Sequence, residues 1–278
     1  MAQAATRVQH PGVLVQPDEG AQADQLVGYM GKNSLDFYAA FFGCTRTRAG
    51  LVALNWRLAA PELAEQIADS EIEFVIVERE QEPLWTAACA LMASPPRAIW
   101  IDENDTYEGL VSGQAETRPD VSVSEDDTAF QLYTSGTTGM PKGVAKPFPG
   151  TPLGTAAGLG APLTQGLYKF REEMVYLSPA PLYHAAPLRF NMSVHSHGGT
   201  TVIMEHFDAE EFLQLIEKYD VTHSQTVPTM FVRLLKLPTD VRTKYETKSL
   251  THVFHAAAPC PIDIKQQTIA WLGPIVHE

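Results

Sequence analysis

Short apolar runs alternate with helix-like segments through the first hundred residues, and this alternation is the strongest constraint on the fold. Between the runs, apolar side chains recur at helical spacing, as they do at Leu35, Tyr38 and Phe42. Strands that alternate with helices through short connections favour a parallel sheet whose two faces are both covered. The sequence therefore predicts an α/β fold with mostly parallel sheets covered by helices. The predicted strands of this half are Gln25–Met30, Leu51–Leu54, Phe74–Val77 and Ala98–Ile101.

The alternation continues through the second half of the chain. Asp208, with Glu211 three positions later, is typical of a helix N-terminus, and Pro228 suits the first turn of the next helix. The acidic stretch 103–127 is expected to link two halves. We therefore predict a loose N-terminal arm over residues 1–23, a first α/β sub-domain over 24–125 and a second over 126–278. The predicted strands here are Ala129–Tyr133, Val175–Leu177, Thr200–Met204, Thr222–Val227 and His252–His255.

The net charge and the cysteine content of the chain limit the classes of partner and the cellular compartment that we expect. With 33 acidic and 20 basic residues, the formal net charge is -13, which disfavours nucleic acid. Cys44, Cys89 and Cys260 are odd in number and far apart, so neither a disulfide framework nor a zinc site is predicted. The polar N-terminus is unlike a secretion signal, and no apolar run approaches the ~18 residues that cross a bilayer. A cytoplasmic location is therefore expected.

Residues 134–143, with the sequence TSGTTGMPKG, carry the most specific chemical signal. Their glycines allow backbone amides to approach an anion closely, and the serine and threonines add hydroxyl donors. Lys142 adds a positive charge, and the segment follows a predicted strand. It differs from the Walker A pattern, because Lys142 is preceded by Pro141 and followed by Gly143 rather than by a hydroxyl residue. The pattern predicts a loop that binds a polyphosphate.

This loop resembles the signature of the adenylate-forming superfamily, which includes acyl-CoA synthetases, peptide-synthetase adenylation domains and firefly luciferase. The resemblance covers the chain from Leu26 to Glu278. Between Ser178 and Pro261 it looks closest to bacterial fatty-acid and bile-acid CoA ligases. It implies two α/β sub-domains of the large N-terminal, AMP-binding domain. Further segments similar to family motifs are Asn33–Phe42, Pro179–His184, Thr226–Met230 and Ala256–Pro259.

The resemblance implies a ligase of fatty acid metabolism that uses ATP, Mg²⁺ and coenzyme A. Family members join a carboxylic acid to ATP, release pyrophosphate and transfer the acyl group of the acyl-AMP to coenzyme A. Positioning and charge neutralisation dominate such a displacement at phosphorus. The small side chains of Ala185 and Ala186 suggest a roomy pocket for a fatty or other bulky apolar acid.

The resemblance also assigns roles to individual residues. Lys142 and His184 are the implied catalytic residues, and Thr138 is the implied metal ligand. The alternative for His184 is a buried structural histidine, and the alternative for 257–259 is a simple turn after a strand. The implied nucleotide-binding residues are Thr134, Ser135, Gly136, Thr137, Thr138, Gly139, Lys142, Ala257, Ala258 and Pro259. The implied acyl-binding residues are His184, Ala185, Ala186, Arg189 and Phe190.

The resemblance is incomplete at both ends of the chain. Beyond Glu278, family members continue into a glutamate that helps to hold Mg²⁺ and into a small mobile domain with a catalytic lysine. Before Leu26 they have a further strand pair and helix. The chain is therefore expected to be a truncated piece of an acyl-CoA ligase (AMP-forming), inactive by itself. Its cut sheet edges are expected to favour association, including homo-oligomers.

Three alternatives remain open from the sequence. The first is a truncated, non-catalytic paralogue that binds a nucleotide or an acyl-adenylate. The second is a peptide-synthetase adenylation domain, although no carrier-protein segment is visible. The third concerns His195 and His197, which would share one face of a strand and, with His206, suggest a metal site. Because no carboxylate or cysteine joins them at ligand spacing, a structural role is favoured for these histidines.

Overall fold

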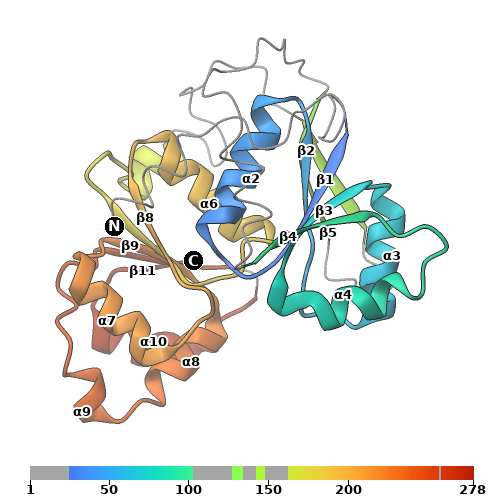
Figure 1. Cartoon of the computed structure of the whole chain (residues 1–278). Coiled ribbons are helices and arrows are strands. Elements are labelled where there is room, and N and C mark those ends of the chain that lie inside the picture. The colour runs from blue at the N-terminus through green and yellow to red at the C-terminus, as the bar shows by residue number, and fades with distance from the viewer. Residues whose placement is uncertain (1–24, 103–126, 134–141, 148–161, 257) are drawn as a thin grey trace. The chain divides into compact units, whose positions relative to one another are not determined.

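The computed structural model describes residues 25–102, 127–133, 142–147, 162–256 and 258–278 (Figure 1). The predicted N-terminal arm and most of the phosphate loop therefore lie outside the described residues. The chain divides into two compact units, residues 1–150 and 151–278. Each unit contains one sheet, and the fold class matches the prediction.

The first unit contains a six-stranded sheet with the order β4-β3-β1-β2-β5-β6. All neighbouring strands are parallel except β5 and β6, which are antiparallel. The predicted strands of this unit are confirmed, and β6 was not predicted. The strands are β1 (Leu26–Met30), β2 (Gly50–Ala53), β3 (Phe74–Glu78), β4 (Arg97–Ile101), β5 (Thr128–Tyr133) and β6 (Gly143–Pro147), and the helices are α2 (Leu35–Arg46), α3 (Ala60–Ser70) and α4 (Glu82–Cys89), the last preceded by a 3₁₀ turn, Arg79–Gln81.

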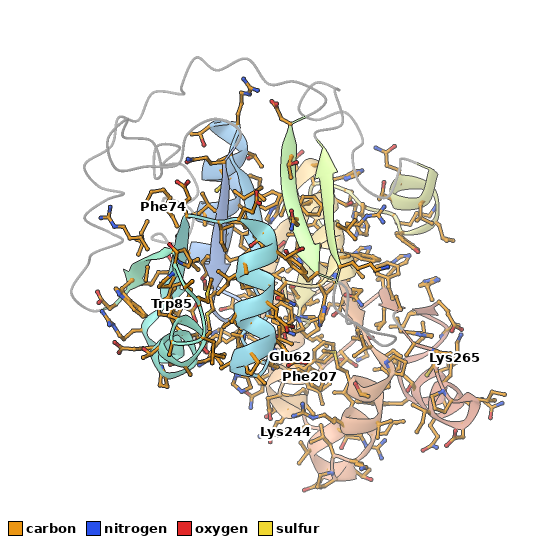
Figure 2. The ribbon with its side chains drawn as sticks, turned by 90° about the vertical axis from the view of Figure 1, so that its right-hand side faces the viewer. Glu62, Phe74, Trp85, Phe207, Lys244 and Lys265 are labelled. Carbon is orange, nitrogen blue, oxygen red and sulfur yellow. The ribbon has the colours of Figure 1, made fainter. Side chains whose placement is uncertain are left out.

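Helices α3 and α4 cover the sheet through a shared apolar core. Leu63 and Ile67 of α3 and Trp85 of α4 are buried against Val52 and Val75 of the strands. Figure 2 labels Trp85 together with Glu62, which lies in the first turn of α3. The spacing of Leu63 and Ile67 by four positions places both on the sheet-facing side of the helix, as the sequence pattern predicts.

Strand β5 belongs to the first unit rather than to the second. Its Phe130 pairs with Leu51 of β2, and the Arg48 guanidinium donates hydrogen bonds of 2.9 and 2.8 Å to the two carboxylate oxygens of Asp127. This buried carboxylate joins the start of β5 to the residues that precede β2. The division therefore falls at Gly150, later than the predicted boundary between residues 125 and 126.

The second unit contains an all-parallel sheet with the order β11-β10-β9-β7-β8. The four predicted strands are confirmed, whereas α6 and α10 were not predicted, because their apolar residues do not form one clear stripe. The elements are a π-helical turn (Pro162–Leu167), β7 (Val175–Ser178), α6 (Ala185–Ser196), β8 (Thr200–Ile203), α7 (Ala209–Tyr219), β9 (His223–Thr226), α8 (Pro228–Leu235), α9 (Thr239–Arg242), β10 (His252–His255), α10 (Ile262–Leu272) and β11 (Val276–His277).

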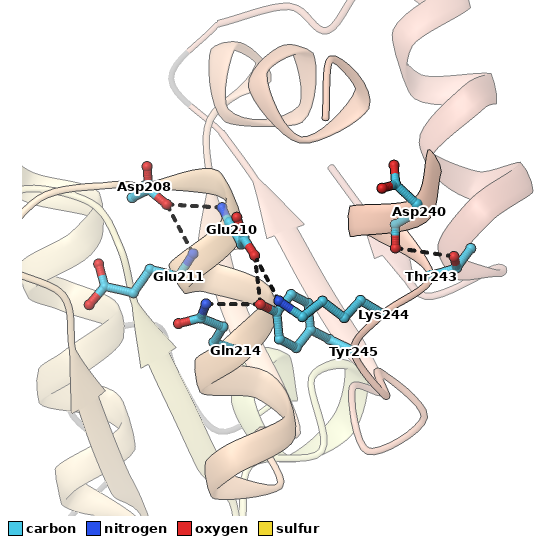
Figure 3. A network of polar contacts seen from close by, with 8 residues as sticks. All are labelled: Asp208, Glu210, Glu211, Gln214, Asp240, Thr243, Lys244 and Tyr245. Atoms are coloured by element: carbon cyan, nitrogen blue, oxygen red, sulfur yellow. Dashed lines mark hydrogen bonds and ion pairs between the residues drawn. The ribbon is translucent and has the colours of Figure 1, made fainter. Parts of the chain in front are cut away.

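Helix α7 begins at the predicted N-cap. The Asp208 carboxylate accepts hydrogen bonds of 3.0 Å from the backbone amides of Glu210 and Glu211 (Figure 3). In the same first turn, the Glu210 carboxylate accepts a 2.7 Å hydrogen bond from the Tyr245 hydroxyl and pairs with Lys244 at 3.3 Å. The cap therefore anchors a helix whose first turn also holds the segment after α9.

We expect Asp208→Ala to lower the free energy of unfolding by about 1 kcal/mol, because two amides of the first turn lose their acceptor. Asp208→Asn is the matched control, since asparagine caps helices about as well as aspartate. Urea denaturation followed by circular dichroism measures both. Equal losses in the two variants would show that the carboxylate acts by its charge and not as a cap.

A row of histidines crosses the second sheet. His223 of β9 pairs in register with His252 of β10, and their rings stack with centroids 4.7 Å apart. The ring of His277 of β11 lies 5.3 Å beyond His252. His223 is fully buried, and its Nε2 atom lies 2.9 Å from the Tyr168 carbonyl. Because a carbonyl only accepts, Nε2 carries the proton of a neutral ring.

The pKa of His223 is lowered from 6.5 to about 4, mainly by burial and in smaller part by the neighbouring His252, Arg171 and His277. The unfolded chain therefore takes up a proton at a higher pH than the folded chain does. We expect the free energy of unfolding to fall as the pH decreases from about 6.5 to about 4. His223→Gln should reduce this slope in denaturation curves taken across the range. An unchanged slope would contradict the assignment.

Candidate functional site

The predicted phosphate loop connects two antiparallel neighbours in the first sheet. Tyr133, the last residue of β5, pairs in register with Gly143, the first residue of β6. Residues 134–141, which include six of the predicted nucleotide-binding residues and among them the predicted metal ligand Thr138, lie outside the described residues. Lys142 is exposed immediately before β6. The two ends of the loop are therefore held together by the β5–β6 pairing.

The base of this hairpin is anchored to α3 by side chains that the sequence analysis did not identify. The Tyr133 hydroxyl donates a 2.7 Å hydrogen bond to the Asp69 carboxylate and accepts one of 3.0 Å from the Gln131 side-chain amide. Burial and the Asp69 carboxylate both raise the pKa of Tyr133, so the hydroxyl stays protonated and can donate. These contacts fix the strand end from which the loop starts.

Gly143 makes the close approach at the other end of the loop possible. A Cβ atom at this position would lie 2.5 Å from the Gln131 side-chain nitrogen and 3.3 Å from the Tyr133 ring. A larger residue would therefore displace the two side chains that anchor the hairpin. Packing against Gln131 and Tyr133 thus explains why the last residue of the predicted motif is a glycine.

In the second unit, three motif segments lie at one edge of the sheet. Residues 179–184 follow β7, residues 227–230 follow β9, and residues 256–259 follow β10. β9 lies between β7 and β10, and all three strands run in the same direction. The carboxyl ends of parallel strands form the usual ligand-binding edge of an α/β sheet. The sheet therefore brings together three segments that are separate in the sequence.

His184 lies at this edge, at the N-cap position of α6, and is exposed. The alternative that it is a buried structural histidine is therefore wrong. Its ring packs edge-on against Tyr183, which is buried, with the centroids 4.6 Å apart. Ala185 is also exposed and Ala186 is half-buried, so the start of α6 presents small side chains and an imidazole to the solvent.

The other two predicted acyl-binding residues differ from each other. Arg189 is exposed on α6, whereas Phe190 is 6% exposed and packs within an aromatic cluster of the second unit. The Phe190 ring stacks on Phe254 at 5.2 Å and on Tyr168 at 5.9 Å. In this structure Phe190 therefore contributes to the core that supports the edge.

Asn191 positions α6, and the sequence analysis missed it. This residue is fully buried, and its side-chain nitrogen donates hydrogen bonds to the Ser178 hydroxyl at 2.9 Å and to the Pro187 carbonyl at 2.8 Å. The first bond joins α6 to the end of β7. It therefore fixes both ends of the connecting residues 179–184. An amide residue in a helix between Phe190 and Val194 is the sequence signal that would have identified it.

The predicted nucleotide-binding residues after β10 are only partly described. Ala258 and Pro259 are exposed after β10, and Ala257 lies outside the described residues. Exposed small residues at this edge are compatible with a planar ligand, and equally with a turn that connects β10 to α10. Both interpretations therefore stay open for these residues.

His195 lies in the last turn of α6 and His197 caps its end, so the two histidines do not share the strand face that the metal-site alternative required. His195 Nε2 lies 3.1 Å from the Thr201 hydroxyl, and burial lowers the pKa of His195 to about 4. His197 Nδ1 donates to the Ser193 carbonyl at 2.7 Å. Within the described residues, no group of three or more His, Cys, Asp or Glu side chains is arranged to hold a metal ion.

No helix in the part of the chain that the structure describes is both long and apolar enough to cross a bilayer.

The comparisons with known proteins agree on one family. A family model described as AMP-binding enzyme matches residues 2–278. The long-chain-fatty-acid–CoA ligase FadD13 of Mycobacterium tuberculosis is 33% identical over 74% of this chain and 40% of its own length. The fatty acid–[acyl-carrier-protein] ligase ScoC of Streptomyces coeruleorubidus is 31% identical over 76% of this chain and 40% of its own. The chain thus spans less than half the length of these relatives.

A solved structure shows the same architecture. The N-terminal domain of FACL13 from Mycobacterium tuberculosis superposes with a TM-score of 0.82 and 26% identity. The match covers 97% of this chain and 65% of that chain. The two mostly parallel sheets of this chain therefore match the architecture of that N-terminal domain.

We expect the Tyr133–Asp69 hydrogen bond to be measurable in a double-mutant cycle. Tyr133→Phe should lower the free energy of unfolding by about 1 kcal/mol, because the Asp69 carboxylate loses a donor. In an Asp69→Ala background the same change should cost close to nothing. Chemical denaturation of the four proteins gives the coupling energy, and a value near zero would show that the contact does not anchor the hairpin.

Proposed function

Because this chain belongs to the family of AMP-binding enzymes, we propose that it is part of an AMP-forming acid–CoA ligase. The reaction would join a carboxylic acid to ATP and then transfer the acyl group to a thiol. One observation of this chain supports the proposal above others. The most specific motif of the sequence connects two strand ends that are hydrogen-bonded neighbours, and Lys142 is exposed where it ends.

In the first step, a carboxylate oxygen would attack the α-phosphorus of ATP. The new acyl–phosphate bond forms as the bond from that phosphorus to the bridging oxygen breaks, and pyrophosphate leaves with the negative charge. Lys142 would neutralise part of this charge as it develops, together with the amides and hydroxyls of residues 135–138. The family implies Mg²⁺ at this step, with Thr138 as its proposed ligand.

The acyl group is proposed to bind at the strand edge of the second unit. His184, Ala185 and Ala186 are accessible there at the start of α6, and small side chains leave room for a bulky acid. Fatty acids are the substrates in the names of both relatives described above. A fatty or similar apolar acid is therefore the proposed substrate class.

Coenzyme A is the proposed acceptor of the acyl group. In the second step its thiol sulfur would attack the acyl-AMP carbonyl, forming a thioester and releasing AMP. The two relatives differ at this point, because one is named for coenzyme A and the other for an acyl-carrier protein. The acceptor therefore has to be measured together with the acid.

We expect the product of the complete reading frame to catalyse ATP–pyrophosphate exchange that depends on an added fatty acid. Lys142→Ala should reduce this exchange by about 100-fold or more, because the departing charge loses its cation. Lys236→Ala is the matched control, since Lys236 is exposed on the second unit, outside every proposed contact. Adding coenzyme A or an acyl-carrier protein to the same reaction then identifies the acceptor.

Two results would contradict the proposal. The first is absence of exchange with acids ranging from acetate to long-chain and aromatic carboxylates. The second is full activity of Lys142→Ala at saturating ATP and at ATP concentrations well below KM, since the lysine would then contact no phosphate.

A further inference from the structure

The first unit carries an apolar groove that takes no part in the site described above. It is bordered by α3 on one side and by residues 91–96, which follow α4, on the other, and its volume is about 660 Å³. The buried side chains of Ala64, Ile67 and Ile72 belong to the core and form part of its lining. Leu91, also in the lining, is 59% exposed. The exposed leucine therefore extends the apolar floor of the groove to the surface of the molecule.

The charged side chains that line this groove are both acidic. They are Glu65, on α3, and Glu71, the C-cap residue directly after the helix. Both carboxylates are exposed, and neither forms an ion pair or a hydrogen bond with any described residue. No Lys, Arg or His is among the residues that line the groove. Both negative charges are therefore available to a cation from outside.

The ends of two helices add to the negative potential. α3 ends at Ser70 and α4 ends at Cys89, and the lining residues Ala68, Glu71 and Leu91 lie in or beside these final turns. The C-terminal end of a helix carries a partial negative charge. A nucleotide or a fatty acid carboxylate would therefore be repelled, whereas a cation joined to apolar groups would be attracted.

The open shape of the groove favours a peptide over a small molecule. Sites for small ligands generally enclose most of the ligand surface, and this groove is open to solvent. A chain segment can place some of its side chains in such a groove while the rest of the segment stays in water. Charge complementarity then requires Lys or Arg next to the apolar side chains.

We propose that this groove is a docking surface for a basic amphipathic peptide segment of a partner protein, in which apolar side chains bind beside Leu91 and Lys or Arg pairs with Glu65 and Glu71. This interaction is separate from the proposed ligase reaction, so it is measured by binding and not by activity.

The test uses the full chain and a short fluorescein-labelled peptide in which leucine alternates with lysine. We expect the fluorescence anisotropy to rise and saturate as protein is added, with a midpoint below about 1 mM protein. The rise should weaken with added salt, because the charge pairs are exposed. A control peptide with glutamate in place of each lysine should not bind. Equal binding of the two peptides would overturn the proposal, as would absence of binding by the basic peptide.

Two sets of variants locate the binding on the groove. Glu65→Gln with Glu71→Gln should weaken binding of the basic peptide roughly five-fold, because two exposed charge pairs are lost. Leu91→Ser should weaken it by a similar factor through lost apolar contact. The control pair Glu172→Gln with Glu173→Gln removes the same net charge from the second unit and should leave binding unchanged. Unchanged binding in both groove variants, or an equal loss in the control, would place the peptide elsewhere.

Circular dichroism spectra and thermal unfolding of each variant separate lost binding from lost folding. All substituted residues are exposed, so we expect unfolding midpoints within a few degrees of the unmodified chain. A folded groove variant that no longer binds the peptide supports the docking surface.

Discussion

The pairing of β5 with β2 on one side and with β6 on the other is the interaction on which the candidate phosphate site depends. β5 follows the acidic stretch that the sequence analysis treated as a linker between halves. Its place in the first sheet is held by backbone pairing with β2 and by the Arg48–Asp127 ion pair. Because Asp127 is buried, breaking this pair would leave an uncompensated charge, which is far more costly than losing a surface ion pair. The loop after β5 therefore starts from a rigid strand end.

In the second unit, the motif segments are brought together because all five strands of the sheet are parallel. The carboxyl ends of all five strands lie at the same edge of the sheet. The residues directly after β7, β9 and β10 therefore all lie at that edge. Buried polar contacts then hold the connecting segments, as Asn191 does when it bonds to Ser178. The aromatic cluster around Phe190 and Phe254 supports the same edge from within. Rigid strands and a packed core thus position residues that are themselves exposed.

The acidic groove on the first unit illustrates how one fold can present surfaces of different chemistry. The predicted phosphate loop contains three glycines and Lys142, a composition expected to favour anions, whereas the charged side chains that line the apolar groove beside α3 are both carboxylates. α3 contributes to both, since Asp69 holds Tyr133 at the base of the hairpin while Glu65 and Glu71 line the groove. A single helix therefore links the two surfaces through neighbouring residues.

The sequence by itself determined the strand–helix alternation, most strand positions and the cap at Asp208, because each depends on side-chain periodicity or local hydrogen bonding. Phosphate binding by residues 134–143 stays a prediction from the sequence motif. At α2 the local pattern offers two capping residues, Asn33 and Ser34, and the structure uses Ser34, whose hydroxyl accepts from the Phe37 amide. Only the tertiary structure decided that β5 joins the first sheet, that His184 is exposed, and that Asn191, Tyr133 and Asp69 hold the loops. These outcomes depend on pairing and packing between residues far apart in the chain, and no local pattern of one sequence specifies which distant partner a strand or a buried polar group will find.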